Sequence, residues 1–227
     1  CKLSSFGNFI WAHSIGGSGD DCAYSVVIDE FNEVLFTGYF SANVDFDPGL
    51  GTTILSGQLS DIFVGKLNSS GSFIFAKSFS GTGDDEANAV QVDASQNIYL
   101  TGSFTETIDF DPDTGNYLLS SYNAGTKDIF LVKLNSVGNL EWAKSIGGSG
   151  NDAGTALVAT NTGEVYSCGY FFGVADFNPD SSTFILPSDG SYDAYITKFD
   201  TAGNFSWANR YGGPSLDMPR TLSVHPS

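Results

Sequence analysis

The chain has 227 residues, 41% of them hydrophobic, which is enough to bury a sizeable core. Nine basic and 26 acidic side chains give a net charge of −17, which repels phosphate backbones and anionic lipid and argues against nucleic-acid or membrane-surface partners. No stretch approaches the ~18 consecutive apolar residues of a membrane-spanning helix, so the sequence predicts no membrane insertion.

A repeat of about 65 residues runs through the chain. A turn and the start of a strand recur as GNFIWA, GSFIFA, GNLEWA and GNFSWA, beginning at Gly7, Gly71, Gly138 and Gly203. Four further segments keep the same phase, and in the second copy they read SGTGDD, TGSF, IDFDP and DIFLVKL. Such agreement indicates tandem copies of one folding unit. The complete copies span approximately residues 17–80, 81–147 and 148–212, between partial copies at 1–16 and 213–227.

Alternating apolar and polar residues predict four strands in each copy. In the second copy they are Ala89 to Val92, Ile98 to Phe104, Ile129 to Leu134 and Leu140 to Ile146, called strands a, b, c and d. Short turns join a to b and c to d, whereas a long link with the DFDP motif joins b to c. This pattern predicts an all-β fold, a β-propeller of four-stranded antiparallel blades, with about three complete blades and two partial ones.

The first partial blade begins at the end of a strand c, and the last is expected to stop after a strand a at Thr221 to Val224. No strand b lies between these two parts, so the chain cannot complete a ring. We therefore expect a single propeller region that is a piece of a larger propeller of roughly six to eight blades, unless other strands close it.

One aromatic position in strand d recurs in every copy, as Trp11, Phe75, Trp142 and Trp207. A large aromatic residue that appears once per unit is typical of a side chain wedged between neighbouring blades, where it buries ~150–250 Å². These residues are therefore interpreted as core and not as a cofactor site.

The second copy, GTGDDEANAVQVDASQNIYLTGSF followed by DFDP and DIFLVKLNSVGNLEWAKSIGG, resembles the bacterial β-propeller repeats called SBBP repeats, and the resemblance covers nearly the whole chain. Proteins of that family are typically large and secreted or surface-attached, and they carry no general enzymatic activity. The resemblance implies an extracellular or cell-surface location. The turn Asn135-x-x-Gly138-x-x-x-Trp142 also looks like the tryptophan-docking repeat of quinoprotein dehydrogenases, but that family's quinone-contacting residues are not seen, so no organic cofactor is expected.

Catalytic residue types are scarce. The two histidines, His13 and His225, are too few for a three-histidine zinc site. Cys1, Cys22 and Cys168 fall at unrelated places in the repeat and predict no disulfide or metal-thiolate pattern. No phosphate-binding loop of the Walker type occurs. The sequence therefore predicts that the protein is not an enzyme.

Paired carboxylates are the chemical feature that recurs. In an a-b-c-d meander the d–a and b–c links lie at the same end, so one face is expected to be acidic. The spacing Asp109-x-Asp111-x-Asp113 is similar to the start of a calcium loop, although Pro112 interrupts it and no EF-hand glutamate follows. The candidate calcium ligands are Asp45, Asp47, Asp109, Asp111, Asp113, Asp176 and Asp180. The alternative is that each Asp accepts hydrogen bonds from its own turn without a metal.

Strand c carries two invariant charges. An aspartate opens it and a lysine lies five residues on, and these pairs are Asp61 and Lys66, Asp128 and Lys133, Asp193 and Lys198. An odd separation puts the two side chains on opposite faces of the strand, so each Lys is expected to pair with a neighbouring element.

The irregular b–c insertions are the expected binding surface, because variable loops on a rigid scaffold commonly carry function. They comprise residues 49–60, 114–127 and 180–192 and include Tyr117, Tyr122 and Tyr192.

The leading hypothesis is a non-catalytic secreted or cell-surface propeller that binds protein or polysaccharide, or spaces parts of an adhesin-like chain. An alternative is a carbohydrate-active hydrolase or lyase whose active site draws on blades outside this sequence. A third is a contact surface in a larger cell-surface assembly, joined by strand sharing at the incomplete blades.

Overall fold

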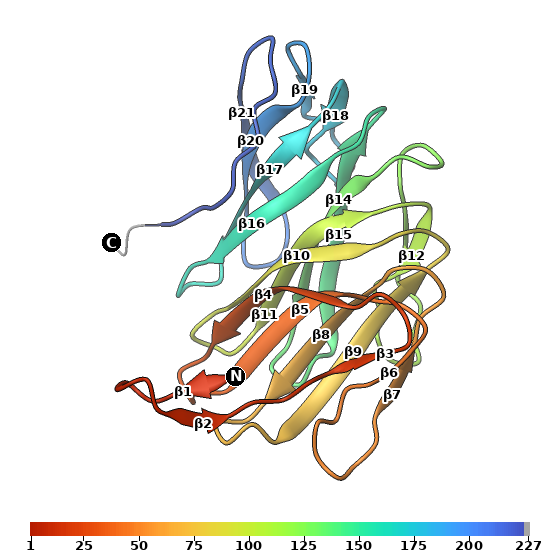
Figure 1. The fold of residues 1–227 in the computed structure, drawn as a ribbon. Helices are drawn as coiled ribbons and strands as arrows, with labels where there is room; N and C mark the ends of the chain where they lie inside the picture. Colours follow the sequence, from red (N-terminus) through yellow and green to blue (C-terminus); the bar gives the residue numbers. More distant parts are fainter. Residues whose placement is uncertain (225–227) are drawn as a thin grey trace.

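The computed structural model describes residues 1–224, which form 21 strands and no helix (Figure 1). The protein is therefore all-β over this range. None of these residues belongs to a helix long and apolar enough to cross a membrane. His225, one of the two histidines considered above, lies outside the described residues.

Three successive units each contain a four-stranded antiparallel meander, in which every strand pairs with the next. The first unit comprises β4 (Cys22–Ile28), β5 (Val34–Phe40), β8 (Asp61–Leu67) and β9 (Phe73–Gly81). The second comprises β10 (Glu86–Val92), β11 (Ile98–Phe104), β14 (Asp128–Leu134) and β15 (Leu140–Gly148). The third comprises β16 (Ala153–Ala159), β17 (Val165–Phe171), β20 (Asp193–Phe199) and β21 (Phe205–Tyr211). The strands expected in the second copy are all present, with β11 at its expected bounds.

A small hairpin interrupts each unit between its second and third strands. These hairpins are β6 (Asn43–Asp45) with β7 (Ile54–Ser56), β12 (Thr107–Asp109) with β13 (Leu118–Ser120), and β18 (Val174–Asp176) with β19 (Ile185–Pro187). Each pairs with the chain that ends the preceding unit, so that Ile108 lies opposite Gly81 and Ala175 opposite Gly148. The hairpin therefore joins neighbouring units by backbone hydrogen bonds.

The N-terminal segment supplies the same elements in incomplete form. It contains β1 (Lys2–Leu3), β2 (Phe9–Trp11) and β3 (Gly16–Gly17). β1 pairs with β2, and β3 pairs with β6 of the first unit, with Gly17 opposite Val44. The segment thus occupies the place of a unit before the first one.

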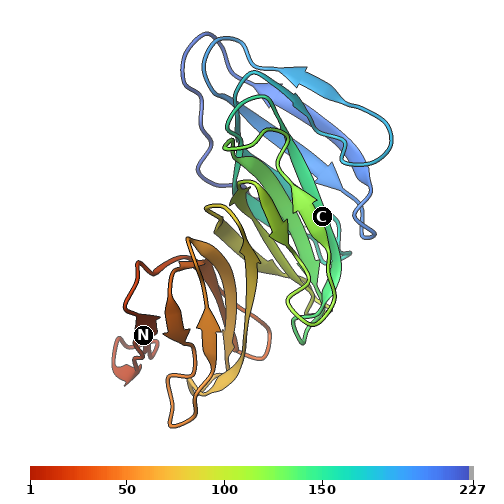
Figure 2. The same ribbon diagram turned by 90° about the vertical axis from the view of Figure 1, so that its right-hand side faces the viewer.

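The units stack face to face, as the two perpendicular views show (Figures 1 and 2). The first strand of a unit, β10 or β16, lies against the sheet of the unit before it. Val90 of β10 is 1% exposed and Leu157 of β16 is 2% exposed, whereas Val26, at the same position in β4, is 67% exposed. The stacking of a neighbouring unit is therefore what buries this position.

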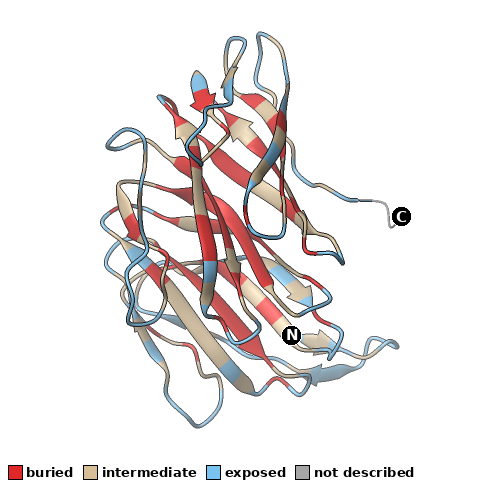
Figure 3. Cartoon of the chain, turned by 180° about the vertical axis from the view of Figure 1, so that it is seen from behind, coloured by how far each residue is buried: buried red, intermediate tan, exposed pale blue. Residues whose placement is uncertain are grey.

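The core lies mainly between the units, where the buried stripes of facing strands meet (Figure 3). The phenylalanine of the DFDP motif belongs to it, since Phe46, Phe110 and Phe177 are at most 2% exposed. Each packs edge-on against the last residue of the second strand, with ring centroids 5.8 Å apart for Phe104 and Phe110. The motif therefore anchors the inserted hairpin through its aromatic residue.

The recurring aromatic residue of the last strand packs against a glycine turn of the next unit. Gly203 has φ +79°, and a Cβ atom on it would lie 2.7 Å from the Trp142 ring. Gly71 and Gly138 stand in the same relation to Trp11 and Phe75. Trp142 is 8% exposed, as expected for a wedge between units. Trp11, Phe75 and Trp207 are half-buried.

The expectation of a strand at Thr221 to Val224 is wrong. Residues 213–224 form no strand, although two hydrogen bonds hold them against the third unit. The Thr155 hydroxyl donates to the carbonyl of Pro219 at 3.0 Å, and the Asp217 N–H donates to the carbonyl of Tyr192 at 2.8 Å. In the complete units the first strand pairs only with the second, and the described residues supply no such partner here. The ladder therefore does not form.

Replacing Gly203 with alanine tests the contact between aromatic ring and turn. We expect the free energy of unfolding to fall by more than the ~1–2 kcal/mol of a left-handed backbone, because the new Cβ also collides with Trp142. Gly125→Ala is the matched control, since its φ is +77° and nothing lies within 4 Å of its Cβ position. Equal losses for the two variants in urea denaturation would contradict the packing role.

Candidate functional site

The predicted calcium ligands that open the b–c links act as acceptors for their own loops. Oδ1 of Asp109 accepts the N–H groups of Asp111 and Tyr117 at 3.0 and 2.8 Å. The same pair of bonds recurs at Asp45, from Asp47 and Thr53, and at Asp176, from Asn178 and Phe184. These three acids each close their loop by backbone hydrogen bonds.

The remaining predicted ligands are used in other ways. Asp47 accepts the N–H of Gly49, and Asp111 accepts that of Asp113. Asp113 and Asp180 form ion pairs with Lys77 and Lys144, which lie on the last strand of the preceding unit. Within residues 1–224, no three His, Cys, Asp or Glu side chains gather closely enough to hold a metal ion. The structure thus supports the loop-closing alternative, and calcium binding stays a prediction.

Calcium removal distinguishes the two interpretations. Because the carboxylates of the b–c links already accept backbone hydrogen bonds, we expect the same melting temperature in a chelator and in excess calcium chloride. Titration calorimetry on the chelator-treated protein should likewise show no heat. A melting temperature that rises with calcium, and that loses the rise in Asp109→Asn, would establish the metal site.

The d–a and b–c links meet at the same end of each unit, as expected. Oδ1 of Asp85, in a d–a link, accepts the N–H of Thr105 at the start of a b–c link, at 3.0 Å. Asp152 makes the corresponding bond with Phe172 at 2.9 Å. The acidic d–a residues therefore fix the entry of the neighbouring inserted hairpin.

Buried aspartates line the junctions between units. The aspartate that opens a third strand lies near the d–a aspartate of the next unit, in the pairs Asp61 with Asp85 and Asp128 with Asp152. All four are at most 2% exposed. One oxygen of Asp85 and one of Asp128 have no hydrogen-bond partner among the described residues. Each junction therefore holds two carboxyl groups in an environment that disfavours charge.

Glycine at the d–a link makes this approach possible. A Cβ on Gly81 would lie 2.8 Å from Oδ2 of Asp85, and one on Gly147 would lie 2.3 Å from Cγ of Asp128. The N–H of Gly148 donates to Asp152 at 3.0 Å. The recurring segment of glycine and aspartate thus allows the two carboxyl groups to approach at the junction between units.

Burial raises the pKa of Asp85, Asp128 and Asp152 to about 7 in each case. The charge of Asp61 adds to the effect at Asp85, and that of Asp128 adds to it at Asp152. Their ordinary pKa is near 4, so the folded protein holds protons that the unfolded chain has released.

This difference predicts a stability that falls as the pH rises from 5 to 8. The contribution of these groups is complete below their ordinary pKa and is lost as the pH passes through about 7. Asp128→Asn should raise the melting temperature more at pH 8 than at pH 5. Because the net charge also contributes to repulsion, the exposed Asp20→Asn serves as the control. A melting temperature that increases from pH 5 to pH 8 would contradict the assignment.

Lys66 and Lys198 pair with acids other than the aspartate of their own strand, as predicted, whereas Lys133 donates to the carbonyl of Thr201 at 3.4 Å. Nζ of Lys66 lies 2.7 Å from Glu33 and 3.1 Å from Asp29, and Nζ of Lys198 lies 2.6 Å from Glu164. These acids belong to the a–b turn of the same unit. The recurring lysine of strand c therefore has a structural role, as does the recurring aspartate that opens the strand.

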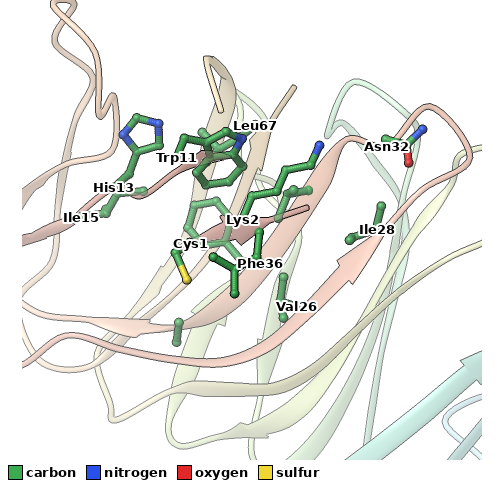
Figure 4. Close-up of a pocket in the computed structure, with 13 residues that line it drawn as sticks. Cys1, Lys2, Trp11, His13, Ile15, Val26, Ile28, Asn32, Phe36 and Leu67 are labelled. Atoms are coloured by element: carbon green, nitrogen blue, oxygen red, sulfur yellow. The ribbon is translucent and has the colours of Figure 1, made fainter. Parts of the chain in front are cut away.

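An apolar cavity of about 700 Å³ opens at the N-terminal end (Figure 4). Trp11, His13, Val26 and Phe36 are among its lining residues. It lies on the face of β4 whose counterparts in β10 and β16 are covered by the preceding unit. His13 lies beside Trp11, with ring centroids 5.2 Å apart. The cavity therefore occupies the face of a unit that is covered at β10 and β16.

A second, polar cavity of about 280 Å³ lies between the first and second units. Its lining comprises Tyr24, Tyr39, Ser60, Asp84, Asp85, Glu86 and Lys127. Ser60 and Lys127 end two of the variable insertions, so the cavity meets part of the predicted binding surface. The predicted tyrosines lie elsewhere, with Tyr122 exposed and the Tyr117 hydroxyl donating to the carbonyl of Ala143 at 3.2 Å.

The charged groups of this cavity are held in place. Nζ of Lys127 lies 2.7 Å from Oε1 of Glu86, which also accepts the hydroxyl of Ser103 at 3.2 Å. The rings of Tyr24 and Tyr39 are tilted, with centroids 5.7 Å apart. Burial and the nearby charge of Glu86 raise the pKa of Tyr24. Two phenol groups, the carboxyl groups of Asp84, Asp85 and Glu86, and one ammonium therefore line one small space.

The cavity residues depart from the repeat. At the next junction the positions of Tyr24, Tyr39 and Glu86 are taken by Asn88, Ser103 and Ala153, and that of Lys127 by Tyr192. The sequence pointed to Ser60 and Lys127 through the variable insertions, but it did not point to Tyr24, Tyr39 or Glu86, which lie on strands outside them. The signal that could have identified the cavity is that these positions differ between copies of the repeat.

No protein-family model matches the chain. Regulatory protein FlaEY of Caulobacter vibrioides is 24% identical over 153 residues, which cover 67% of this chain and 16% of that protein. The uncharacterized WD repeat-containing protein L264 of Acanthamoeba polyphaga mimivirus is 25% identical over 188 residues, 72% of this chain and 14% of that protein. The chain thus spans a small part of the length of these relatives. Similarity to a WD repeat-containing protein agrees with a repeated β-structure.

Proposed function

We propose that the chain is part of a non-catalytic β-propeller of the SBBP type, secreted or displayed on a cell surface, that binds protein or polysaccharide. The observation that carries this proposal is the repeated stacking of four-stranded meanders, which is the arrangement of propeller blades. Similarity to a WD repeat-containing protein adds support, since WD repeats are a propeller architecture.

The roles of the recurring residues favour binding or scaffolding. The aromatic, glycine, aspartate and lysine residues that recur in each copy form contacts within and between units. The positions that vary gather in the inserted hairpins and in the polar cavity between the first two units. A rigid frame with variable loops at one end is typical of proteins that present a binding surface.

Binding to immobilised glycans and to surface proteins tests the proposal. We expect saturable binding to a defined glycan or protein, with no turnover when polysaccharides are incubated with the protein. Release of reducing ends or of unsaturated sugars would favour the hydrolase or lyase alternative. Absence of any specific binding across both panels would contradict the binding role.

A further inference from the structure

We propose that the polar cavity between the first two units binds a single neutral sugar ring. This inference rests on the proposed binding function and names its ligand class. The cavity of about 280 Å³ is close to the lower limit of the ~300–1,000 Å³ typical of small-molecule sites. A ligand of one ring fits this size, whereas an extended chain would continue outside it.

Two inclined tyrosine rings form the apolar part of the cavity lining. Tyr24 is 48% exposed, and its ring is inclined at 54° to that of Tyr39 at 5.7 Å. Such rings offer an apolar face to the C–H groups of a pyranose and a hydroxyl at the rim, because tyrosine is both apolar and polar. Neither residue recurs at the next junction, where Asn88 and Ser103 stand instead.

The polar groups suit a ligand whose hydroxyls both donate and accept. Glu86 and Lys127 neutralise each other at 2.7 Å and still present an acceptor and a donor. Ser60 and the exposed Asp84 complete the rim. The buried Asp85 also lines the cavity, and one of its oxygens has no hydrogen-bond partner among the described residues. Each hydroxyl of a sugar can therefore find a partner without the burial of an unpaired charge.

Anionic ligands are disfavoured, and cations are the class that competes with a neutral sugar. An anion would meet Asp84 and Glu86 in a protein of net charge −17, which repels it. A cation would meet the ammonium of Lys127, but the carboxyl groups of Asp84, Asp85 and Glu86 outnumber that ammonium. Two tyrosines near carboxylates also resemble the surroundings that quaternary ammonium groups prefer. Choline is therefore the decisive competitor.

Saturation-transfer NMR and titration calorimetry on the full chain test the assignment. The probes are the methyl glycosides of glucose, mannose, galactose and N-acetylglucosamine, together with glucuronate and choline. We expect at least one neutral glycoside to bind with a dissociation constant on the order of 1 mM. Glucuronate and choline should not bind.

Substitutions of the two tyrosines test whether the glycoside binds in this cavity. Tyr24→Ala and Tyr39→Ala should each weaken binding of the neutral glycoside at least tenfold. The control Tyr211→Ala, 54% exposed at the end of β21 and outside the insertions, should leave that binding within twofold. Loss of the glycoside in Tyr24→Ala with an unchanged melting temperature would support the site.

Three results would overturn the assignment: no neutral glycoside binds, choline binds instead, or binding persists in both tyrosine variants. Glycan or protein binding that is insensitive to Tyr24 would leave the proposed function standing while removing this site. Failure of all binding would remove both.

Discussion

The contact between a large aromatic ring and the bare backbone of a glycine turn is the interaction on which the arrangement of units depends. Trp142 can lie against the next unit only because Gly203 has no side chain there. Because that glycine also adopts a left-handed conformation, one residue type satisfies both the turn and the packing. At the same junction the apolar side chain of Leu157 in β16 is 2% exposed.

The junctions between units also contain buried pairs of carboxyl groups. A pair such as Asp128 and Asp152 fixes two loops through backbone N–H groups, yet it lies where charge is poorly solvated. Apolar packing between the sheets offsets this cost. The hydrogen bonds at each junction specify how one unit is oriented on the next. The hydrophobic contacts provide most of the stabilisation.

The sequence carried enough information for the repeat, the strands and the aromatic wedge, because each depends on local periodicity or on one residue type per unit. Strand β11 follows directly from alternation over Ile98–Phe104. The strand expected at Thr221 to Val224 failed because a strand needs a partner as well as a pattern. Local propensity cannot supply that partner.

The sites between units were beyond such reasoning. Tyr24, Glu86 and Lys127 are brought together by stacking, and no rule of spacing connects them. Likewise, the predicted calcium ligands were recognised as a pattern, but the direction of Asp109 towards its own loop depends on backbone geometry. Pairs such as Asp61 and Asp85 were visible as separate columns, and only the fold shows that they meet.

The inserted hairpins have a mechanical consequence. Because β12 pairs with the end of β9, the last strand of one unit is bonded both to its own sheet and to a hairpin that belongs to its successor. Tension along the chain would therefore load two neighbouring units together, and neither could be drawn out without tearing the other's backbone bonds. Neighbouring units are therefore expected to resist extension together and not one at a time.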